Sequence, residues 1–328
     1  MIVRFEKGRT LGHPDSIDWQ HCTLGLDVGG TKMAGCVLTS TGEVAATCLS
    51  ETRAGRGTEA VVANALTLVQ SLINQATKLK LQPVGLGISV CELVDRDGSI
   101  VSDFTLSWRE PTVLEPFRSL LPIVVEADCR AGALAEARFG VGRDFPSFLY
   151  VSIGTGISCS LVIDGVPYQG ARGCTGTMAT GTFSTLCSEC GEISHSNLEQ
   201  MSSGLGIENR YAKLSTVQHP KSQRLSSREI LKLAEEGDAV ARRVIVQAGE
   251  CVGSAISLLV NVLDPHAVVV GGGLGSADGL YWDTLVRTAR LQIWSEIHRD
   301  LPIVQGKLGA NAGAIGAATR AQQIVAGN

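Results

Sequence analysis

Two glycine-threonine turns, each set between apolar runs, carry the residue types that hold nucleotide phosphates. The first turn follows Asp27-Val28 and reads Gly29-Gly30-Thr31-Lys32, and the apolar runs on either side of it read as strands. Glycines leave backbone N–H groups open to an anion, the hydroxyl and ammonium groups add donors, and the carboxylate can hold a metal ion. This combination suits a nucleoside triphosphate with Mg²⁺. The second turn, Gly154-Thr155-Gly156, repeats the pattern, and an internal duplication is more specific than either copy alone.

Asp128 is the strongest candidate for acid–base chemistry. It follows the apolar strand predicted over 123–125 and precedes an alanine-rich helix predicted over 129–139. A carboxylate that faces a cleft from this position can accept a proton from a hydroxyl group, as a general base does. An aspartate before an alanine-rich helix is also typical of an N-cap. The residues alone leave both interpretations open.

The remaining pattern predicts an α/β fold, because strands and helices alternate and are separated by glycine turns. A strand over 267–270 runs into a third glycine turn, Gly271-Gly272-Gly273. Residues 170–200, which are rich in serine and contain cysteines, are expected to form a loop. The other expected elements are helices at 58–79, 115–120, 227–236, 238–262 and 313–326, a strand at 83–90 and hairpins at 23–50 and 149–165.

Composition excludes several classes of function. The net charge of −4 over 328 residues, without a lysine or arginine run, argues against a nucleic-acid-binding surface. The most apolar region, 252–274, is interrupted by Asn261 and Asp264, so we expect no membrane span. Charged residues such as Arg4 and Glu6 exclude a signal peptide, and ten scattered cysteines then favour reduced thiols in a cytoplasmic protein.

These motifs resemble those of the ROK family, named for its repressors, open reading frames and sugar kinases. Four blocks carry the resemblance: 24–32, 126–140, 152–173, and 261–273 continuing to 308–316. The resemblance implies a two-lobed actin-like ATPase (ribonuclease H-like) fold with mixed sheets and ATP and sugar in the cleft between the lobes. It places 22–126 and 311–328 in a small lobe and 127–310 in a large lobe, with 1–21 as an N-terminal extension.

By this resemblance the chain is a kinase that transfers phosphate from ATP to a hydroxyl group of a sugar or sugar-like polyol. Asp128 would be the general base and Asp27 would position Mg²⁺. A homodimer is expected, because family members are commonly dimers. The residues that would contact the nucleotide are Asp27, Gly29, Gly30, Thr31, Lys32, Gly154, Thr155, Gly156, Gly271, Gly272 and Gly273.

The predicted sugar pocket departs from the family pattern. Ala127 replaces the usual Asn, and Thr177 and Thr180 replace the sugar-binding Glu and His, whereas Glu199 retains an acidic ligand. Each lost hydrogen bond to a buried hydroxyl costs about 1–3 kcal/mol, so glucose should be a poor substrate. The candidate substrate-binding residues are Glu92, Asp103, Ala127, Arg130, Thr177 and Glu199. Arg130 has two interpretations, as an anion ligand or as a surface partner of Glu126.

Two functions compete on this basis. In one, the pocket is rebuilt for a cyclitol, an amino or deoxy sugar, or an acidic sugar; in the other, the chain is a nucleotide- or sugar-binding sensor without catalysis. The retained base and phosphate turns favour the enzyme. Because only 21 residues precede Cys22, a winged helix-turn-helix is not expected, and the repressor branch of the family is disfavoured.

A structural zinc site is the last candidate. The resemblance points to Cys187, Cys190 and His195, where many family members carry a cysteine-rich zinc motif. The usual first ligand is replaced by Thr180, and Cys174 is a candidate for the fourth position. Reduced cysteines in an ordinary loop remain the alternative.

Overall fold

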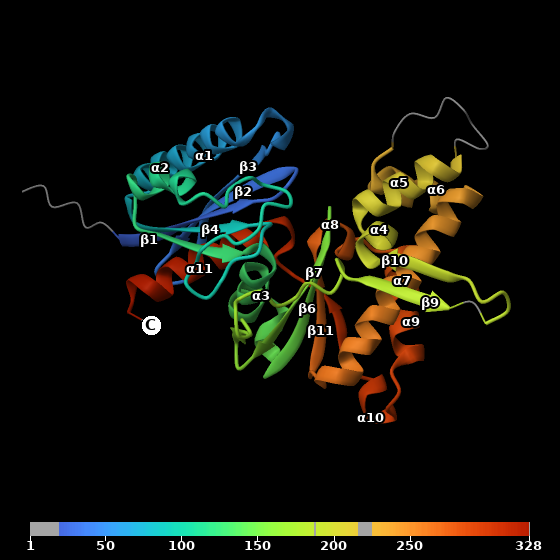
Figure 1. Ribbon diagram of the computed structural model, residues 1–328. Helices are drawn as coiled ribbons and strands as arrows, with labels where there is room; N and C mark the ends of the chain where they lie inside the picture. Colours follow the sequence, from blue (N-terminus) through green and yellow to red (C-terminus); the bar gives the residue numbers. More distant parts are fainter. Residues whose placement is uncertain (1–19, 187, 216–224, 328) are drawn as a thin grey trace, which may run out of the picture.

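Two mixed β-sheets, each of five strands in the described part of the chain, form the centres of two lobes (Figure 1). The structure is a computed structural model that describes residues 20–186, 188–215 and 225–327. The first sheet is built by the chain up to Ala127, and the second is built by later strands. The predicted lobe boundaries remain a prediction, although the first strand already begins at Gln20, inside the expected N-terminal extension.

The small-lobe sheet has the strand order β3-β2-β1-β4-β5. β1 pairs with β2 in antiparallel fashion and with β4 in parallel, and β4 pairs with β5 in parallel. Figure 1 shows helices α1 and α11 on opposite faces of this sheet. The bounds are β1 Gln20–Val28, β2 Lys32–Thr39, β3 Val44–Glu51, α1 Thr58–Lys78, β4 Leu81–Val90, α2 Glu115–Arg118, β5 Ile123–Ala127 and α11 Ala312–Val325.

Small residues let α11 lie very close to the sheet. A Cβ atom added at Gly25 would lie 1.9 Å from the carbonyl oxygen of Ala314, and one at Gly87 would lie 1.8 Å from that of Ala317. On the other side of α11, a Cβ atom at Gly316 would lie 1.7 Å from the carbonyl oxygen of Ala131 in α3, Asp128–Phe139. The helix is therefore clamped between the small-lobe sheet and α3, which carries Asp128 as its first residue.

The large-lobe sheet has the order β12-β11-β6-β7-β8 and is covered on both faces. Alternation along β6 explains this arrangement: Phe148 and Tyr150 pack with α3, whereas Leu149 and Val151 pack in the cluster that contains α7 and α9. The bounds are β6 Ser147–Ile153, β7 Ile157–Ile163, β8 Val166–Pro167, α4 Leu198–Ser202, α5 Gly204–Ser215, α6 Ser227–Glu235, α7 Ala239–Leu263, β11 Ala267–Gly271, α8 Gly272–Gly275, α9 Leu280–Gln292, α10 Glu296–Arg299 and β12 Ile303–Gln305. By length and composition α7 alone among the described helices is apolar enough to cross a membrane, but half of that stretch is buried inside the protein.

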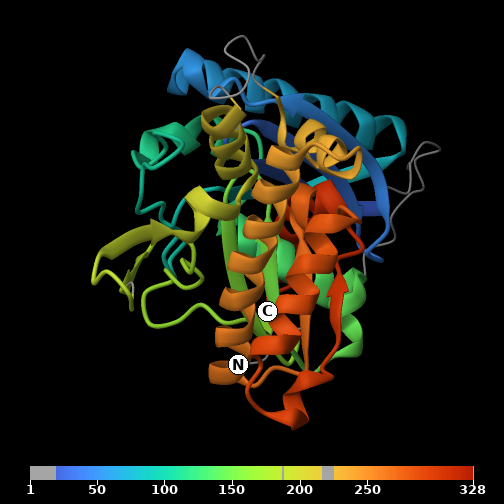
Figure 2. The same cartoon turned by 90° about the vertical axis from the view of Figure 1, so that its right-hand side faces the viewer.

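The expectation of a loop over 170–200 holds as far as residue 181 and was wrong beyond it. Strands β9, Thr182–Leu186, and β10, Ile193–Asn197, pair as an antiparallel hairpin that projects from the large lobe in both views (Figures 1 and 2). The sequence of these strands shows no alternation of apolar and polar residues, because most of the residues are polar. The side chains of Ser184, Leu186 and Ile193 are all exposed. Serine content and the cysteines indicated a loop, while hydrogen bonding between the two backbones produces a sheet.

Candidate active site

The first glycine turn is a tight hairpin between β1 and β2, held from outside by Thr52. Inside the turn the Gly29 amide donates to the Lys32 carbonyl at 3.0 Å. The buried Thr52 hydroxyl donates to the Gly29 carbonyl at 2.5 Å, and the Thr52 amide donates to the Thr31 carbonyl at 2.9 Å. This brace fixes the turn while Thr31 and Lys32 stay exposed and available to a ligand. No sequence motif pointed to Thr52.

The second glycine turn joins β6 and β7 and lies against the first. The Gly154 amide donates to the Gly156 carbonyl at 2.9 Å, which closes the turn. The hydroxyl oxygens of Thr31 and Thr155 are 3.3 Å apart, so the two turns face each other across the junction of the lobes. An added Cβ atom at Gly154 would meet nothing within 4 Å, so this backbone borders open space. The predicted pair of phosphate turns is thus brought together by the fold.

The third glycine turn borders a hollow of about 450 Å³. Gly272 has φ +81°, and an added Cβ atom there would lie 2.4 Å from the Ile153 carbonyl oxygen, so only glycine fits. Gly273, by contrast, is exposed and borders open space. Arg228 and Lys232 of α6 line the same hollow, together with Gly309. A planar base with a ribose fits a hollow of this kind, which offers both bare backbone and cationic side chains.

Asp27 and Asp128 are a coupled pair of carboxylates at the ends of β1 and β5. Asp27, at the end of β1, accepts from the Ser89 hydroxyl at 2.5 Å, and burial raises its pKa to about 6. Asp128 accepts from the Cys129 amide at 2.6 Å. Burial first, and then the negative charge of Asp27, raise the pKa of Asp128 to about 7. An added Cβ atom at Gly313 would lie 2.5 Å from the Asp27 carboxyl carbon, so the start of α11 also abuts this group.

Two nearby acids with raised pKa values fit a site that receives a divalent cation and a proton. A cation beside Asp27 would relieve the repulsion between the carboxylates, and carboxylate oxygen is a preferred Mg²⁺ ligand. Asp128 is the first residue of α3 rather than its N-cap, which is Ala127. Its Oδ1 atom accepts from the adjacent Cys129 amide, so the other oxygen is left to accept a proton from a bound hydroxyl group.

Comparison with known proteins agrees with this geometry. The sequence pattern that describes the ROK family matches residues 23–324. The chain belongs to the ROK family. The crystal structure of a ROK family glucokinase from Streptomyces griseus, in complex with glucose and AMPPNP, matches with a TM-score of 0.79 and 26% identity, covering 92% of this chain and 99% of that one. The two-lobed actin-like fold is therefore shown.

Relatives by sequence fall into two functional groups. Glucokinase from Halalkalibacterium halodurans is 27% identical over 280 residues, which cover 80% of this chain and 82% of that protein. The xylose repressor of Bacillus subtilis is 24% identical over 255 residues, which cover 76% of this chain but 64% of the repressor. The ROK family thus contains both sugar kinases and repressors among the relatives of this chain.

Glu92 has a structural task in this ROK protein. Its buried carboxylate accepts from the Ser102 hydroxyl and from the backbone amides of Phe104, Thr105 and Leu106, the last at 2.7 Å. With four donors satisfied, both oxygens are engaged by the chain itself. The loop held in this way reaches the first phosphate turn, because an added Cβ atom at Gly30 would lie 2.8 Å from the Thr105 methyl group.

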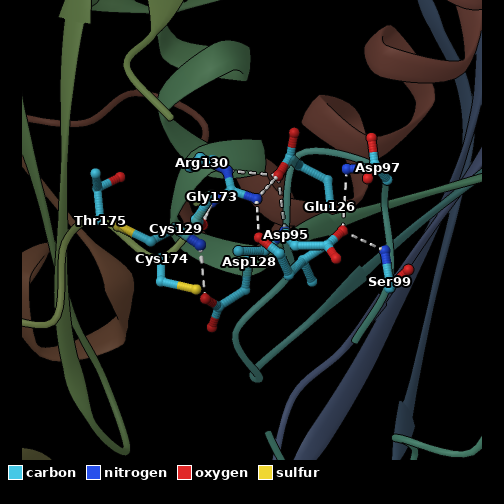
Figure 3. A network of polar contacts seen from close by, with 12 residues as sticks. Asp95, Asp97, Ser99, Glu126, Asp128, Cys129, Arg130, Gly173, Cys174 and Thr175 are labelled. Carbon is cyan, nitrogen blue, oxygen red and sulfur yellow. Dashed lines mark hydrogen bonds and ion pairs between the residues drawn. The ribbon is translucent and has the colours of Figure 1, made fainter. Parts of the chain in front are cut away.

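Arg130 is likewise engaged, and not on the surface. It is buried, and its guanidinium donates to Glu126 at 2.6 Å, to the Val94 carbonyl at 2.8 Å and to the Gly173 carbonyl (Figure 3). These contacts tie α3 to one loop of each lobe. The contacts of Glu92 and Arg130 within the chain are positioning contacts, and a direct contact of either residue with substrate stays a prediction.

The other predicted substrate residues lie on several separate segments. Glu199 accepts from the Ile157 amide at 2.9 Å and lies against Gly156, so it links the substrate side to the second phosphate turn. Ala127 adjoins Asp128, whereas Asp103 and Thr177 are exposed on separate loops. Cys174, which the sequence offered as a fourth zinc ligand, donates its thiol to the Arg172 carbonyl at 3.5 Å.

The predicted zinc ligands do not gather within the described residues. Cys187 lies outside them, Cys190 is exposed, and His195 shares a hydrogen bond with the Ser184 hydroxyl at 2.9 Å. No group of three His, Cys, Asp or Glu side chains suited to a metal ion occurs in the part of the chain that the structure describes. A zinc site on the β9–β10 hairpin stays a prediction.

Proposed function

We propose that the protein is an ATP-dependent kinase that phosphorylates a hydroxyl group of a sugar or sugar-like polyol other than glucose. The observation that carries the proposal is the meeting of the two phosphate turns through Thr31 and Thr155, beside the acid pair Asp27 and Asp128. Phosphoryl transfer depends mainly on positioning and charge neutralisation, and these residues supply both.

In this proposal each residue has a defined task. The amides of the glycine turns and Lys32 hold the phosphates, and Asp27 holds Mg²⁺, which neutralises the charge that develops on them. Asp128 accepts the proton of the attacking hydroxyl group. Its pKa of about 7 lets it take the proton near neutral pH and release it after transfer. Closure of the two lobes over bound substrate excludes water from the site.

The acceptor is proposed to differ from glucose, because the pocket carries Ala127, Thr177 and Thr180 in place of the family's Asn, Glu and His. The glucose complex belongs to the Streptomyces griseus relative. The test is ADP release, coupled to a dehydrogenase, with cyclitols, amino sugars, deoxy sugars, acidic sugars and glucose. A preference for one of the first four classes is expected. Efficient turnover of glucose below millimolar concentration would contradict the substrate proposal.

A sensor that binds nucleotide or sugar without catalysis is the second candidate, and the likeness to the xylose repressor favours keeping it. The same screen separates the two. Nucleotide binding by calorimetry, together with no ADP release for any acceptor, supports the sensor and overturns the kinase.

We also propose a homodimer through an apolar surface at the end of the large lobe. Leu291, Trp294 and Ile297 are 76%, 87% and 89% exposed, beside the 69% exposed Val262. Asn261 joins these segments, since its side chain accepts from the Trp294 amide at 3.0 Å. Light scattering should give twice the chain mass, and Trp294→Ser with Ile297→Ser should give a monomer. A monomeric wild type would refute this surface as an interface.

Zinc and location complete the proposal. Structural zinc on the β9–β10 hairpin would appear as about one equivalent in protein purified without chelator, and its loss in Cys190→Ser would place it there. Cytoplasmic location is supported by the nine described cysteines, all of which are free thiols.

A further inference from the structure

A cavity of about 660 Å³ lies between the lobes, apart from the phosphate turns and from Asp27 and Asp128. Arg320 and Gln323 of α11 and Arg96 of the β4–β5 connection line it from the small-lobe side. Tyr168 and its neighbours after β8 line it from the large-lobe side. Its floor is formed by Glu126 and Arg130, which lie two residues before and two residues after the predicted base.

Glu126 has a free oxygen at this cavity. Its side chain is 9% exposed, and its Oε1 atom accepts from Arg130 and from the Ala127 amide at 2.9 Å. Within the described residues its Oε2 atom has no hydrogen-bond partner, yet it is not sealed off from solvent. Figure 3 shows this second oxygen pointing away from the Arg130 guanidinium. A nearly buried carboxylate oxygen that borders a cavity calls for a hydrogen-bond donor, such as a hydroxyl group.

The charge of the lining favours an anion as well. Arg130 is neutralised by Glu126, at 2.5 Å. Arg96 and Arg320 form no ion pair in the described part of the chain, and Arg320 makes only a 3.2 Å bond to the Gln323 amide oxygen. Two unpaired guanidinium groups at one cavity match the oxygens of a phosphate. Asp95 and Asp97 line an adjoining hollow with Arg96 and Arg172, outside the larger cavity.

We propose that this cavity binds a hydroxyl-bearing phosphate ester, with the phosphate on Arg96 and Arg320 and a hydroxyl group donating to Glu126 Oε2. The ligand would touch both lobes, so its binding would be linked to their relative position. The site is distinct from the proposed catalytic site and does not depend on it.

Calorimetry on the full chain tests the site with glycerol 3-phosphate as the probe, beside inorganic phosphate and glycerol. Glycerol 3-phosphate should bind at least about tenfold more tightly than either fragment, because charge-assisted hydrogen bonds and the hydroxyl contact are combined. Arg320→Ala and Arg96→Ala should each weaken it about tenfold. Arg228→Ala, at the hollow beside the third glycine turn, is the matched control and should leave the affinity within about twofold.

Each of the other calorimetric outcomes contradicts a specific part of the proposed site. Equal affinity for inorganic phosphate overturns the hydroxyl contact with Glu126. Unchanged affinity in Arg320→Ala and Arg96→Ala, with loss in Arg228→Ala, places the probe near the third glycine turn and overturns the site. No heat at millimolar probe overturns it too. Both lining variants remove partly or fully exposed side chains, so melting temperatures near the wild-type value should confirm that they fold.

Discussion

Substitution of Asp128 by Asn should slow turnover strongly and at the same time stabilise the protein. The side-chain oxygen of the variant still accepts the hydrogen bond from the Cys129 backbone N–H, but the side chain cannot take a proton. Turnover should therefore fall by about 10²–10⁴-fold. The folded carboxyl has a pKa of about 7, against an ordinary value of 3.8. At about 1.4 kcal/mol per pKa unit, this difference corresponds to about 4 kcal/mol of destabilisation by the ionised group.

The sign of the stability effect follows from linkage. Because the folded-state pKa is raised, the folded protein binds the proton more tightly than the unfolded chain does. This carboxyl therefore carries no penalty below about pH 3.8, and its destabilising contribution grows as pH rises toward 7, where nearly all of it is present. The uncharged amide of the variant carries no such penalty. We expect Asp128→Asn to be more stable by about 2–4 kcal/mol at pH 8 and nearly equal to wild type at pH 4.

Denaturant unfolding at both pH values and ADP release measure the two effects on one sample. Asp164→Asn is the matched control: Asp164 is exposed in the turn after β7 at φ +51°, a conformation that Asn also adopts readily. The control should change neither stability nor turnover. Near-normal turnover in Asp128→Asn would remove Asp128 as the base. Equal stability at pH 8 would show that the carboxylate is not strained by its surroundings, and the argument from burial would fail.

Three further outcomes are expected. The kcat/KM for the acceptor should rise with pH along a limb at or below pH 7, because Asp128 must be deprotonated and bound Mg²⁺ lowers its pKa; a flat profile from pH 5 to 8 would contradict this. Glu92→Gln should raise the KM for both ATP and the acceptor by about tenfold, since an amide nitrogen opposes a backbone donor and the loosened loop carries Asp103 and contacts Gly30 of the first phosphate turn, while exposed Glu110→Gln should change neither. Gly25→Val should destabilise the fold by about 3 kcal/mol or more because its side chain meets the Ala314 carbonyl, whereas Gly181→Val has open space and should be neutral, as thermal unfolding would report.

Local patterns were sufficient for most of the fold. The helix predicted at 58–79 is observed as Thr58–Lys78, and the helix predicted at 313–326 as Ala312–Val325. In both segments apolar or small residues recur at helical spacing, so a helix places them on one face that can be buried. The two phosphate turns were equally readable, because a glycine-threonine turn between apolar strands constrains the backbone from within a few residues. The hairpin at 182–197 was missed because its strands lack a clear apolar alternation.

Long-range partners could not be predicted in this way. Glu92 was a candidate ligand because it is a charged residue in a segment that departs from the family pattern, and Arg130 because it lies beside the predicted base. Their partners, the amides of 104–106 for Glu92 and the Val94 and Gly173 carbonyls for Arg130, are set by loops whose conformation the sequence does not specify. Thr52 and Ser89 were missed for the same reason, since a single hydroxyl carries no spacing signal.

These long-range partners account for the position of the two acids. Asp27 and Asp128 repel each other at the lobe junction, so the surrounding chain must hold them in place without neutralising them. Arg130, a buried cation near Asp128, forms an ion pair with Glu126 and donates its other hydrogen bonds to the Val94 and Gly173 carbonyl oxygens. A lysine there would lack the planar set of donors that makes all these contacts at once. The arginine therefore fixes the helix that carries the base and lowers the pKa of Asp128 by less than burial and Asp27 raise it. The pKa stays near 7, which is the condition for a carboxylate to accept a proton near neutral pH.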